Sequence, residues 1–313
     1  MIKKLTIGSR DSKLALIQTE LVRDALLETY PGLEIEILKI KTQGDKILDV
    51  ALSKIGDKGL FTKELEKELL EGNIDLAVHS MKDLPTNLPE GLEIACTSPR
   101  EDVRDVVCLS EHAKARGIES IADAQVIATS SLRRIAQLKS LYPDKEFVDI
   151  RGNLQTRFQK LNDPENKIDA LVLAAAGIIR LGEENWIDEY LDPQEVFPAV
   201  GQGALGIEIK SGNLELREFL REVLNSEIDE AIIQAERSFL RELEGGCQVP
   251  IGIYAEEDDG NLVLQGIVCS LDGTDDVAGL VGGTLEEAES LGIELAEMLL
   301  EEGAAELLKA IKE

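Results

Sequence analysis

Residues 74–85 read IDLAVHSMKDLP, and within a few positions they change from an apolar run to a polar one that ends at a proline. A short apolar run is typical of a buried parallel strand. Ligands of open α/β sheets gather beyond the carboxyl ends of strands, so Ser80, Lys82 and Asp83 are expected at such an edge. Pro85 disfavours helix before it, which predicts a turn. Taken alone, Lys82 and Asp83 fit either a solvated ion pair or a carboxylate with its charge partner in a cleft.

The chain on either side of this stretch alternates predicted strands and helices. A strand, a turn, a helix and a second strand at the start indicate a parallel βαβ unit. In the first hundred residues we expect strands at 5–7, 33–40 and 92–97, a turn at 8–12 with Asp11 or Ser12 as helix N-cap, a polar loop at 41–59 and a helix at 60–70.

A second α/β set follows an expected linker at 98–104. Its strands are predicted at 106–109, 126–128, 147–150 and 170–173, and its helices at 132–141, 154–161 and 174–181. A strand at 204–209, helices at 214–224 and 228–243, three strand-like runs within 249–281 and a helical end complete the pattern. Two α/β domains and a smaller C-terminal α+β domain are therefore predicted.

Composition narrows the function classes. The chain has 313 residues, 43% of them hydrophobic, and a net charge of -28, which disfavours nucleic acid and anionic membranes as partners. No apolar run approaches the ~20 residues of a membrane helix, and the apolar start is too short for a signal peptide, so a cytoplasmic location is expected. Two histidines and four cysteines without C-x-x-C spacing predict neither a metal site nor a disulfide framework.

Basic side chains gather where the predicted second domain begins its helices. Thr129, Ser130 and Ser131 follow a strand and precede Arg133 and Arg134 on a first helical turn. Hydroxyl groups, free N–H groups and the positive helix end attract anions there. A plain N-cap with exposed arginines is the alternative.

Further arginines extend this pattern. Arg151 and Arg157 flank the start of the next helix, and Arg180 ends the one after it. Guanidinium groups bind carboxylates through two parallel hydrogen bonds. The arrangement indicates a small polyanionic ligand rather than one phosphate or a nucleic acid.

Three other features have plain structural interpretations. The motif GQGALG at 201–206 matches G-x-G-x-x-G, but a strand follows it instead of a helix, which disfavours a dinucleotide. Its glycines are expected to allow close packing where the chain returns to the first domain. Chemistry alone makes Cys247 a small packed residue, because a helix C-terminus precedes it. His79 is expected to be hydrogen-bonded beside its strand.

Eight segments together resemble the hydroxymethylbilane synthase, or porphobilinogen deaminase, family. In order they are IGSRDSKLALIQ, KGLFTKELE, DLAVHSMKDLP, ATSSLRR, RGNLQTR, AAAGIIRLG, PAVGQGA and EGGCQVPIG, which span residues 7–252. Any one of them is a weak signal, but eight in family order are specific. The last ~60 residues resemble the family only in their α+β pattern.

The resemblance implies an enzyme that condenses four porphobilinogen molecules head to tail, releases ammonia at each addition and frees a linear tetrapyrrole by hydrolysis. Growth takes place on a dipyrromethane cofactor, which the family holds by a thioether to the cysteine that corresponds to Cys247. The catalytic aspartate corresponds to Asp83, whose carboxylate stabilises an azafulvenium-type cation. The resemblance thus replaces the packed-residue interpretation of Cys247.

The resemblance also implies a binding set for the cofactor and substrate carboxylates. It comprises Arg10, Ser12, Ser80, Lys82, Thr129, Ser130, Ser131, Arg133, Arg134, Arg151, Gly152, Arg157, Arg180 and Gln202, with Lys54, Lys58 and Phe61 on or beside the 41–59 loop. Many relatives have consecutive glycines before the family lysine, where this chain has Gly56-Asp57-Lys58, so loop behaviour is expected to differ.

The expected fold is two periplasmic-binding-protein-like α/β domains, at 1–99 plus 200–221 and at 104–196, with an α+β domain at 226–313 that contains the cofactor cysteine. A monomer is expected. The competing class is a non-catalytic solute-binding module for a small polycarboxylate, which needs neither Cys247 nor Asp83. A hydrolase or acyl transferase that uses Cys247 is disfavoured because no paired histidine is evident.

Overall fold

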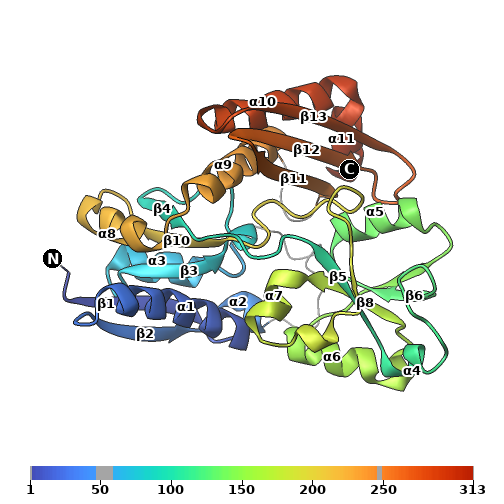
Figure 1. The fold of residues 1–313 in the computed structure, drawn as a ribbon, viewed down its shortest axis with the longest axis horizontal. Helices are drawn as coiled ribbons and strands as arrows, with labels where there is room; N and C mark the ends of the chain where they lie inside the picture. The colour runs from blue at the N-terminus through green and yellow to red at the C-terminus, as the bar shows by residue number, and fades with distance from the viewer. Residues whose placement is uncertain (1, 47–58, 245–248, 313) are drawn as a thin grey trace.

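The computed structural model describes residues 2–46, 59–244 and 249–312, and the strands of this part of the chain form three separate sheets (Figure 1). The first two sheets have five strands each and the third has three. The first sheet draws strands from both sides of the second sheet in the sequence, whereas the second and third sheets are each continuous in the chain.

The first sheet has the strand order β2-β1-β3-β10-β4. Its strands are β1 (Lys4–Arg10), β2 (Glu34–Ile40), β3 (Leu76–Ser80), β4 (Leu92–Thr97) and β10 (Leu205–Lys210). β1 runs parallel to β2 and β3, as expected for a βαβ unit, while β10 runs antiparallel between β3 and β4. The late strand β10 therefore completes a sheet that the first hundred residues begin.

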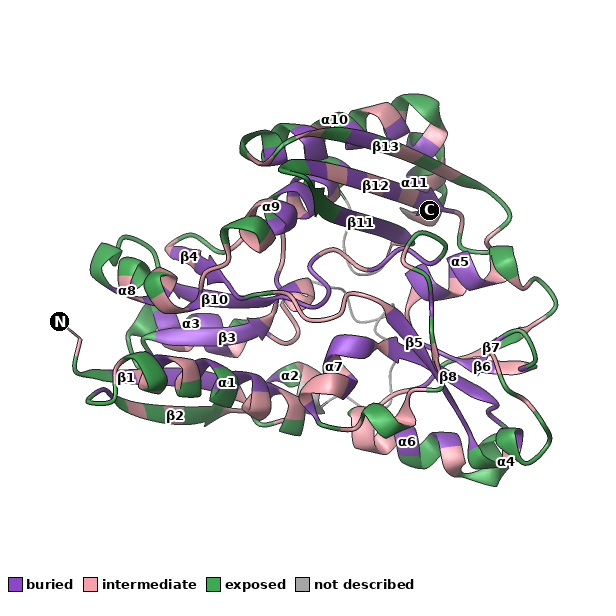
Figure 2. Ribbon diagram, viewed as in Figure 1, coloured by how far each residue is buried: buried purple, intermediate pink, exposed green. Residues whose placement is uncertain are grey.

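Helices pack on both faces of this sheet, and β3 shows why. Successive side chains of a strand point to opposite faces. Leu76 and Val78 join the core that α1 (Lys13–Thr29) and α8 (Leu214–Leu224) cover, whereas Ala77 packs against α3 (Lys63–Glu71). Four of the five residues of β3 are buried (Figure 2).

The second sheet repeats this plan with the order β7-β6-β8-β5-β9. Its strands are β5 (Asp105–Leu109), β6 (Val126–Ala128), β7 (Glu146–Val148), β8 (Ala170–Ala174) and β9 (Glu189–Tyr190), and its helices are α4 (Glu111–Lys114), α5 (Leu132–Leu141), α6 (Leu154–Asn162) and α7 (Ala175–Arg180). The fourth strand, β5, is again the antiparallel one. In both sheets this strand is the first that the chain enters after crossing from the other domain.

The third unit is an antiparallel sheet of β11 (Ile251–Asp258), β12 (Asn261–Cys269) and β13 (Asp276–Thr284). One core joins this sheet to α9 (Glu227–Glu242), α10 (Ala288–Leu299) and α11 (Ala305–Lys312). Shorter helical segments are α2 (Gln43–Lys46), 3-10 turns at Met81–Asp83, Pro164–Asn166, Glu184–Trp186 and Leu285–Glu287, and a π-type segment at Leu300–Ala304.

The predicted architecture of two α/β domains and a smaller α+β domain is confirmed, and helices α5 and α8 have the predicted bounds. The turn expected at 8–12 is wrong in its first three residues, because β1 continues to Arg10 in register with β2. Gly8 suits this strand because a Cβ atom there would lie 2.3 Å from Ile74 Cδ1. The helix expected from residue 60 begins at Lys63, and the strand expected to reach residue 150 ends at Val148.

The loop expected at 41–59 contains the short helix α2, and residues 47–58 lie outside the described part of the chain. The glycines of the 201–206 motif pack as predicted. A Cβ atom at Gly201 would lie 2.7 Å from Met81 Cγ, and one at Gly203 would lie 2.4 Å from the Glu101 carbonyl oxygen. Both glycines have positive φ angles, so other residues would also be strained.

The described residues lack two features. None of their helices is both long and apolar enough to cross a membrane. Nor do they contain a group of three or more His, Cys, Asp or Glu side chains that is arranged to hold a metal ion.

The contact between α9 and α10 yields a stability prediction. A Cβ atom at Gly292 would lie 2.0 Å from Ser238 Oγ and 2.2 Å from the Ala235 carbonyl oxygen. Gly292→Ala should therefore lower the free energy of unfolding by about 1–3 kcal/mol despite the better helix propensity of alanine. Urea unfolding should show this loss, while Gly282→Ala, whose Cβ atom would meet only the Leu262 carbonyl oxygen at 3.6 Å, should show little change. A more stable Gly292→Ala variant would contradict the packing described.

Candidate active site

The chain turns off the first sheet where the sequence predicts. β3 ends at Ser80, and Met81–Asp83 form a 3-10 turn. The Met81 N–H donates to the Ala204 carbonyl oxygen at 2.9 Å, so the turn is tied to the segment that enters β10. Lys82 and Asp83 consequently lie at the carboxyl end of β3, at the edge where ligands of such sheets bind.

Asp83 lines a small hollow on the first domain. Arg10, Gln18, Phe61 and Ser80 are among the other residues of its wall. The Arg10 guanidinium lies 4.2 Å from the centre of the Phe61 ring, and Gln18 Nε2 donates to Ser80 Oγ at 2.9 Å. The structure thus brings together four predicted residues, Arg10, Phe61, Ser80 and Asp83, around one hollow.

His79 also reaches this hollow, and it is hydrogen-bonded beside its strand as predicted. Its Nε2 atom lies 3.0 Å from Glu208 Oε2, and both side chains are buried. Glu66 is buried nearby, and burial is the main cause that raises the pKa of its carboxyl group; the charge of Glu208 acts in the same direction. The Glu66 carboxyl group therefore lies close to the buried pair of His79 and Glu208.

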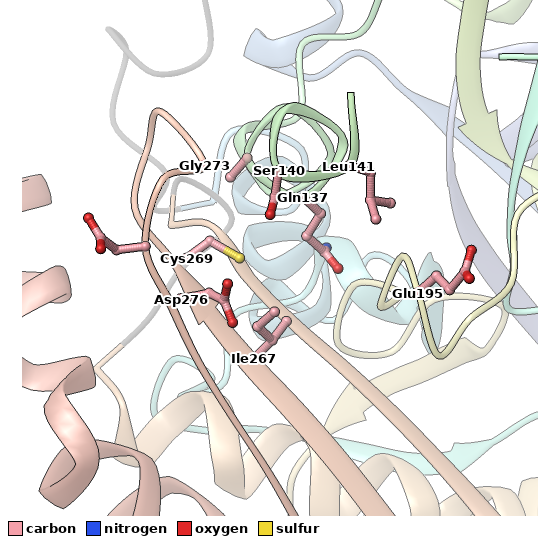
Figure 3. Close-up of a pocket in the computed structure, with 10 residues that line it drawn as sticks. Gln137, Ser140, Leu141, Glu195, Ile267, Cys269, Gly273 and Asp276 are labelled. Carbon is pink, nitrogen blue, oxygen red and sulfur yellow. The ribbon is translucent and has the colours of Figure 1, made fainter. Parts of the chain in front are cut away.

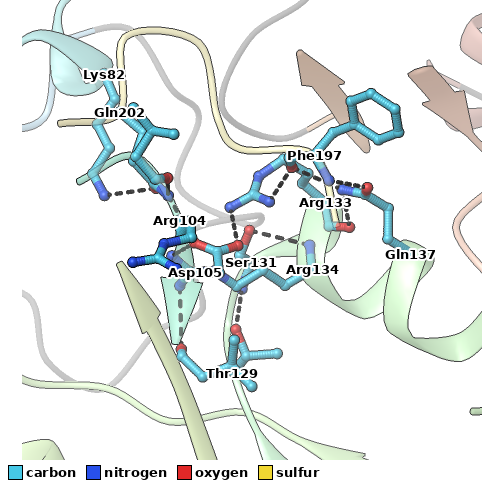
Figure 4. Close-up of polar contacts among 12 residues, drawn as sticks. Lys82, Arg104, Asp105, Thr129, Ser131, Arg133, Arg134, Gln137, Phe197 and Gln202 are labelled. Carbon is cyan, nitrogen blue, oxygen red and sulfur yellow. Dashed lines mark hydrogen bonds and ion pairs between the residues drawn. The ribbon is translucent and has the colours of Figure 1, made fainter. Parts of the chain in front are cut away.

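Arg133 and Arg134 share a buried carboxylate, Asp105, which sequence reasoning missed (Figure 4). Arg133 Nη2 and Arg134 Nη2 each lie 2.8 Å from one Asp105 oxygen. Only 5% of Arg133 and 7% of Arg134 is exposed, so the alternative of exposed arginines behind an N-cap is wrong. Each guanidinium also donates to a carbonyl oxygen, that of Phe197 or Val172.

The charges of this cluster do not cancel. Burial by itself would raise the pKa of Asp105, but the charges of Arg133 and Arg134 outweigh it and hold that pKa well below its ordinary value. Asp105 is therefore ionised at neutral pH. Two guanidinium groups facing one carboxylate leave a net positive charge inside the protein, which attracts anionic ligands.

Gln202 connects this cluster to the turn after β3. Its Nε2 donates to Asp105 Oδ1 at 2.8 Å and to the Val103 carbonyl oxygen, while its Oε1 accepts from Lys82 Nζ at 3.3 Å (Figure 4). Burial, followed by the charge of Arg134, lowers the pKa of Lys82 to about 8. One amide side chain thus joins the site residues of the first and second domains.

Arg157 of α6 and Arg151, which lies just before that helix, extend the positive region. Burial lowers the pKa of Arg157 to about 10, with further contributions from the charges of Arg134 and Arg151. Arg157 Nε donates to the Gly152 carbonyl oxygen at 2.9 Å, and Gly152 has a φ angle of 114°. These predicted residues therefore lie within electrostatic reach of one another.

Two of the four predicted binding residues Ser12, Thr129, Ser130 and Ser131 cap helices in this structure. Ser12 Oγ accepts from the Ala15 N–H, and Ser131 Oγ accepts from the Arg134 N–H, so both are N-caps. Ser130 Oγ donates to the Ile150 carbonyl oxygen, and Thr129 is buried. Their part in ligand binding stays a prediction.

Arg180 reaches from α7 to the segment between β9 and β10, where its Nη2 donates to the Gly203 carbonyl oxygen at 2.6 Å.

Arg100, which sequence reasoning placed in a linker, binds Glu236 of α9. Its Nη1 atom lies 2.7 Å from Glu236 Oε1. Arg100 Nε also donates to the Gln202 carbonyl oxygen at 2.6 Å. An isolated arginine before a strand has no sequence signal that would reveal these partners.

A separate hollow lies between α5 and the third sheet (Figure 3). Gln137, Ser140, Cys269 and Asp276 are among the residues that line it. Burial raises the pKa of the Cys269 thiol to about 12, so this cysteine is a poor nucleophile. None of the predicted site residues that the structure describes lines this hollow.

Cys247, Lys54, Lys58 and Asp57 lie outside the described residues. The other three cysteines are described, and burial is the main cause that raises the pKa of each thiol to about 12.

The chain has a weak structural likeness to a binding protein and a strong sequence likeness to curated enzymes. A periplasmic binding protein of Salmonella typhimurium has a weak structural likeness, with 14% identity, a TM-score of 0.40 and coverage of 71% of this chain and 91% of that one. Porphobilinogen deaminase of Nostoc sp. is 50% identical over 309 residues, which are 99% of this chain and 95% of that protein. The corresponding protein of Gloeobacter violaceus is 52% identical over 313 residues, with 99% and 94% coverage.

Family models agree with these relatives and favour the enzyme over the solute-binding module. Residues 5–218 match the model described as "Porphobilinogen deaminase, dipyromethane cofactor binding domain". Residues 231–301 match the model of the "Porphobilinogen deaminase, C-terminal domain". The chain belongs to the porphobilinogen deaminase family.

Proposed function

We propose that Asp83 is the catalytic carboxylate and Cys247 the cofactor attachment point of this transferase. The enzyme, a hydroxymethylbilane synthase, condenses four porphobilinogen molecules head to tail with release of ammonia and then frees the linear tetrapyrrole. The observation that supports the residue assignment best is the buried excess of positive charge around Asp105, which Gln202 links to the turn of Asp83.

The residues of the site fit a dipyrromethane cofactor, which the first family model names. Such a cofactor and its porphobilinogen-derived extensions carry acetate and propionate groups. Guanidinium donors of Arg133, Arg134 and Arg157 and the ammonium of Lys82 match carboxylates in charge and hydrogen-bonding geometry. When bound, the cofactor provides the pyrrole carbon to which the first substrate is joined.

The remaining basic residues have roles by position. Arg10, Arg151 and Arg180 add positive charge around the site, and Ser80 and Gln202 orient their neighbours through side-chain hydrogen bonds. Ser12, Thr129, Ser130, Ser131 and Gly152 shape the chain at helix starts, and Lys54, Lys58 and Phe61 belong to or adjoin the loop. We assign these residues to cofactor and substrate binding.

Asp83 suits catalysis because of where it stands. Positive charge develops on the substrate pyrrole as the aminomethyl nitrogen leaves, and a nearby carboxylate stabilises that charge and accepts a pyrrole N–H. Asp83 lies on a short turn at the sheet edge, in the wall of a hollow, and beside the cationic Lys82.

We also assign a cytoplasmic location and a monomeric state, with porphobilinogen as the small-molecule partner and neither nucleic acid nor membrane bound. The acidic surface, with a net charge of -28, supports the exclusion of polyanionic partners. The domain limits 1–99 plus 200–221, 104–196 and 226–313 are consistent with the strands of each sheet.

Asp83→Asn should keep the fold but lower kcat by about 100-fold or more, because the amide cannot stabilise the developing cation. Ammonia release by the cofactor-loaded protein measures the loss. Asp11→Asn is the matched control, since Asp11 is exposed just beyond the end of β1 and should keep normal turnover. Near-normal ammonia release by Asp83→Asn would contradict the assignment.

Intact-protein mass spectrometry tests the attachment. Protein supplied with porphobilinogen should gain the mass of a dipyrromethane, and peptide mapping should place it on Cys247. Cys247→Ser should gain no such mass, whereas Cys269→Ala should load normally because its thiol is buried and has a raised pKa. A modification on any other residue would refute the proposal.

The lowered pKa of Lys82 predicts a pH dependence. Its ammonium is charged below pH 8 and loses its attraction for carboxylates as the pH rises through about 8. Cofactor-free protein should therefore load more slowly above about pH 8, as followed by intact mass. Lys82→Arg should remove this alkaline decline because guanidinium stays charged. Superimposable pH profiles for the two proteins would rule out Lys82 as the titrating group.

A further inference from the structure

One arginine of the third domain contacts the chain immediately after the turn of Asp83. Arg237 lies on α9, which passes beside the first sheet in Figure 1. Its Nη2 donates to the Pro85 carbonyl oxygen at 2.6 Å and to that of Thr86 at 3.2 Å, and its Nη1 donates to the Leu84 carbonyl oxygen at 3.4 Å. Three successive carbonyl groups thus converge on one guanidinium.

These carbonyl groups need a donor from outside their own segment. The chain beyond Asp83 forms neither helix nor strand until β4 begins at Leu92, so it has no regular ladder of backbone hydrogen bonds. Pro85 has no N–H to contribute. Unpaired carbonyl groups withdrawn from water are costly, and the planar fork of an arginine can serve several at once.

The same face of α9 supports the turn by apolar contact. Ile233 stands one helical turn before Arg237, and residues four apart lie on one face of a helix. Ile233 packs in a small buried cluster with Met81, Leu84 and Ala204. The Arg237 Nη1 atom also lies 3.9 Å from the Met81 sulfur. Two residues of α9 therefore contact the turn: Ile233 packs against its apolar side chains, and Arg237 binds the carbonyl groups that follow it.

The charge of Arg237 is not used in a direct ion pair among the described residues. Burial, followed by the charge of Arg241, lowers its pKa to about 10, and Glu208 acts in the opposite direction from a distance. Glu208 itself contacts His79. A partly buried cation against neutral carbonyl groups costs more than an apolar side chain of similar size. What the arginine contributes instead is a fixed backbone conformation of residues 84–86, whose carbonyl groups it binds.

We propose that Arg237 is a positioning residue for Asp83. By fixing the carbonyl groups of Leu84, Pro85 and Thr86, it holds the turn in one conformation and keeps the Asp83 carboxylate aimed at the reacting pyrrole. This inference rests on the proposed catalytic role of Asp83. Arg237 does not line the hollow of Asp83, so it acts through the backbone and not on the substrate.

The test compares Arg237→Met with Arg237→Lys and with a control on the same helix. Arg241→Met is that control, because Arg241 lies one turn further along, is 40% exposed and pairs with Glu289 on the surface. Each protein is isolated with its cofactor, and intact mass, thermal midpoint, kcat, KM and amide hydrogen exchange are measured. The exchange of the Leu84 amide, which donates to the Met81 carbonyl oxygen, reports the turn without reference to activity.

Arg237→Met should lose about 10- to 100-fold in kcat, because a small misplacement of a catalytic group has effects of this size, with little change in KM. The Leu84 amide should exchange faster while the amides of β11 and β12 stay protected. Arg237→Lys should recover much of both properties, since its ammonium can still donate to carbonyl groups. Arg241→Met should behave as the parent protein.

A double variant separates positioning from a general structural role. If Arg237 acts through Asp83, then Arg237→Met should lower kcat little further in the Asp83→Asn protein. A full additional loss there, unchanged kcat in Arg237→Met, or faster exchange spread over the third domain would overturn the inference. If Arg237→Met does not fold, Arg237→Lys decides. A folded lysine variant with parent-like kcat and parent-like Leu84 exchange supports the inference. A lysine variant that also fails to fold overturns it. Near-normal turnover of Asp83→Asn would instead refute the proposed function.

Discussion

The shared contact of Arg133 and Arg134 with Asp105 is the constraint around which the site is arranged. A carboxylate removed from water is stable only when opposite charges and donors surround it, and here two guanidinium groups and the Gln202 amide do so. Asp105 is the first residue of the antiparallel strand β5. The cluster therefore joins the start of α5, the start of β5 and Gln202, which lies on the segment between β9 and β10.

Periodicity and capping explain which parts were predictable. The apolar run before Ser80 and the Ser131 cap before α5 are local signals, and the structure confirms the elements they predict. The partners of the arginines were not predictable in this way, because Asp105 is distant in sequence and looks like any acidic residue before a strand. Family motifs pointed to Arg133 and Arg134 as site residues, but they did not reveal that both are buried against a carboxylate.

Support from outside the sheet edge was also invisible to sequence reasoning. Arg100 and Arg237 look like ordinary charged residues of a linker and an amphipathic helix. Yet Arg100 binds Glu236 of α9, and Arg237 of α9 binds the carbonyl groups that follow the turn of Asp83. Their contacts depend on how the third domain packs against the first, which no local pattern encodes. At the end of β1 the local signal was misleading. Gly8, Ser9 and Arg10 suggested a turn, but pairing with β2 keeps them extended.

The position of β10 affects how the protein is made. This strand lies between β3 and β4, yet it follows the whole second domain in the chain. During synthesis from the N-terminus, β3 and β4 must wait without their shared neighbour while more than a hundred residues are added. Bare strand edges are sites of mispairing, and pairings between distant segments form slowly. The strand that ends in the turn of Asp83 is thus among the last to gain its full set of neighbours, so a nascent chain completes the sheet edge around this turn only after the second domain has been made.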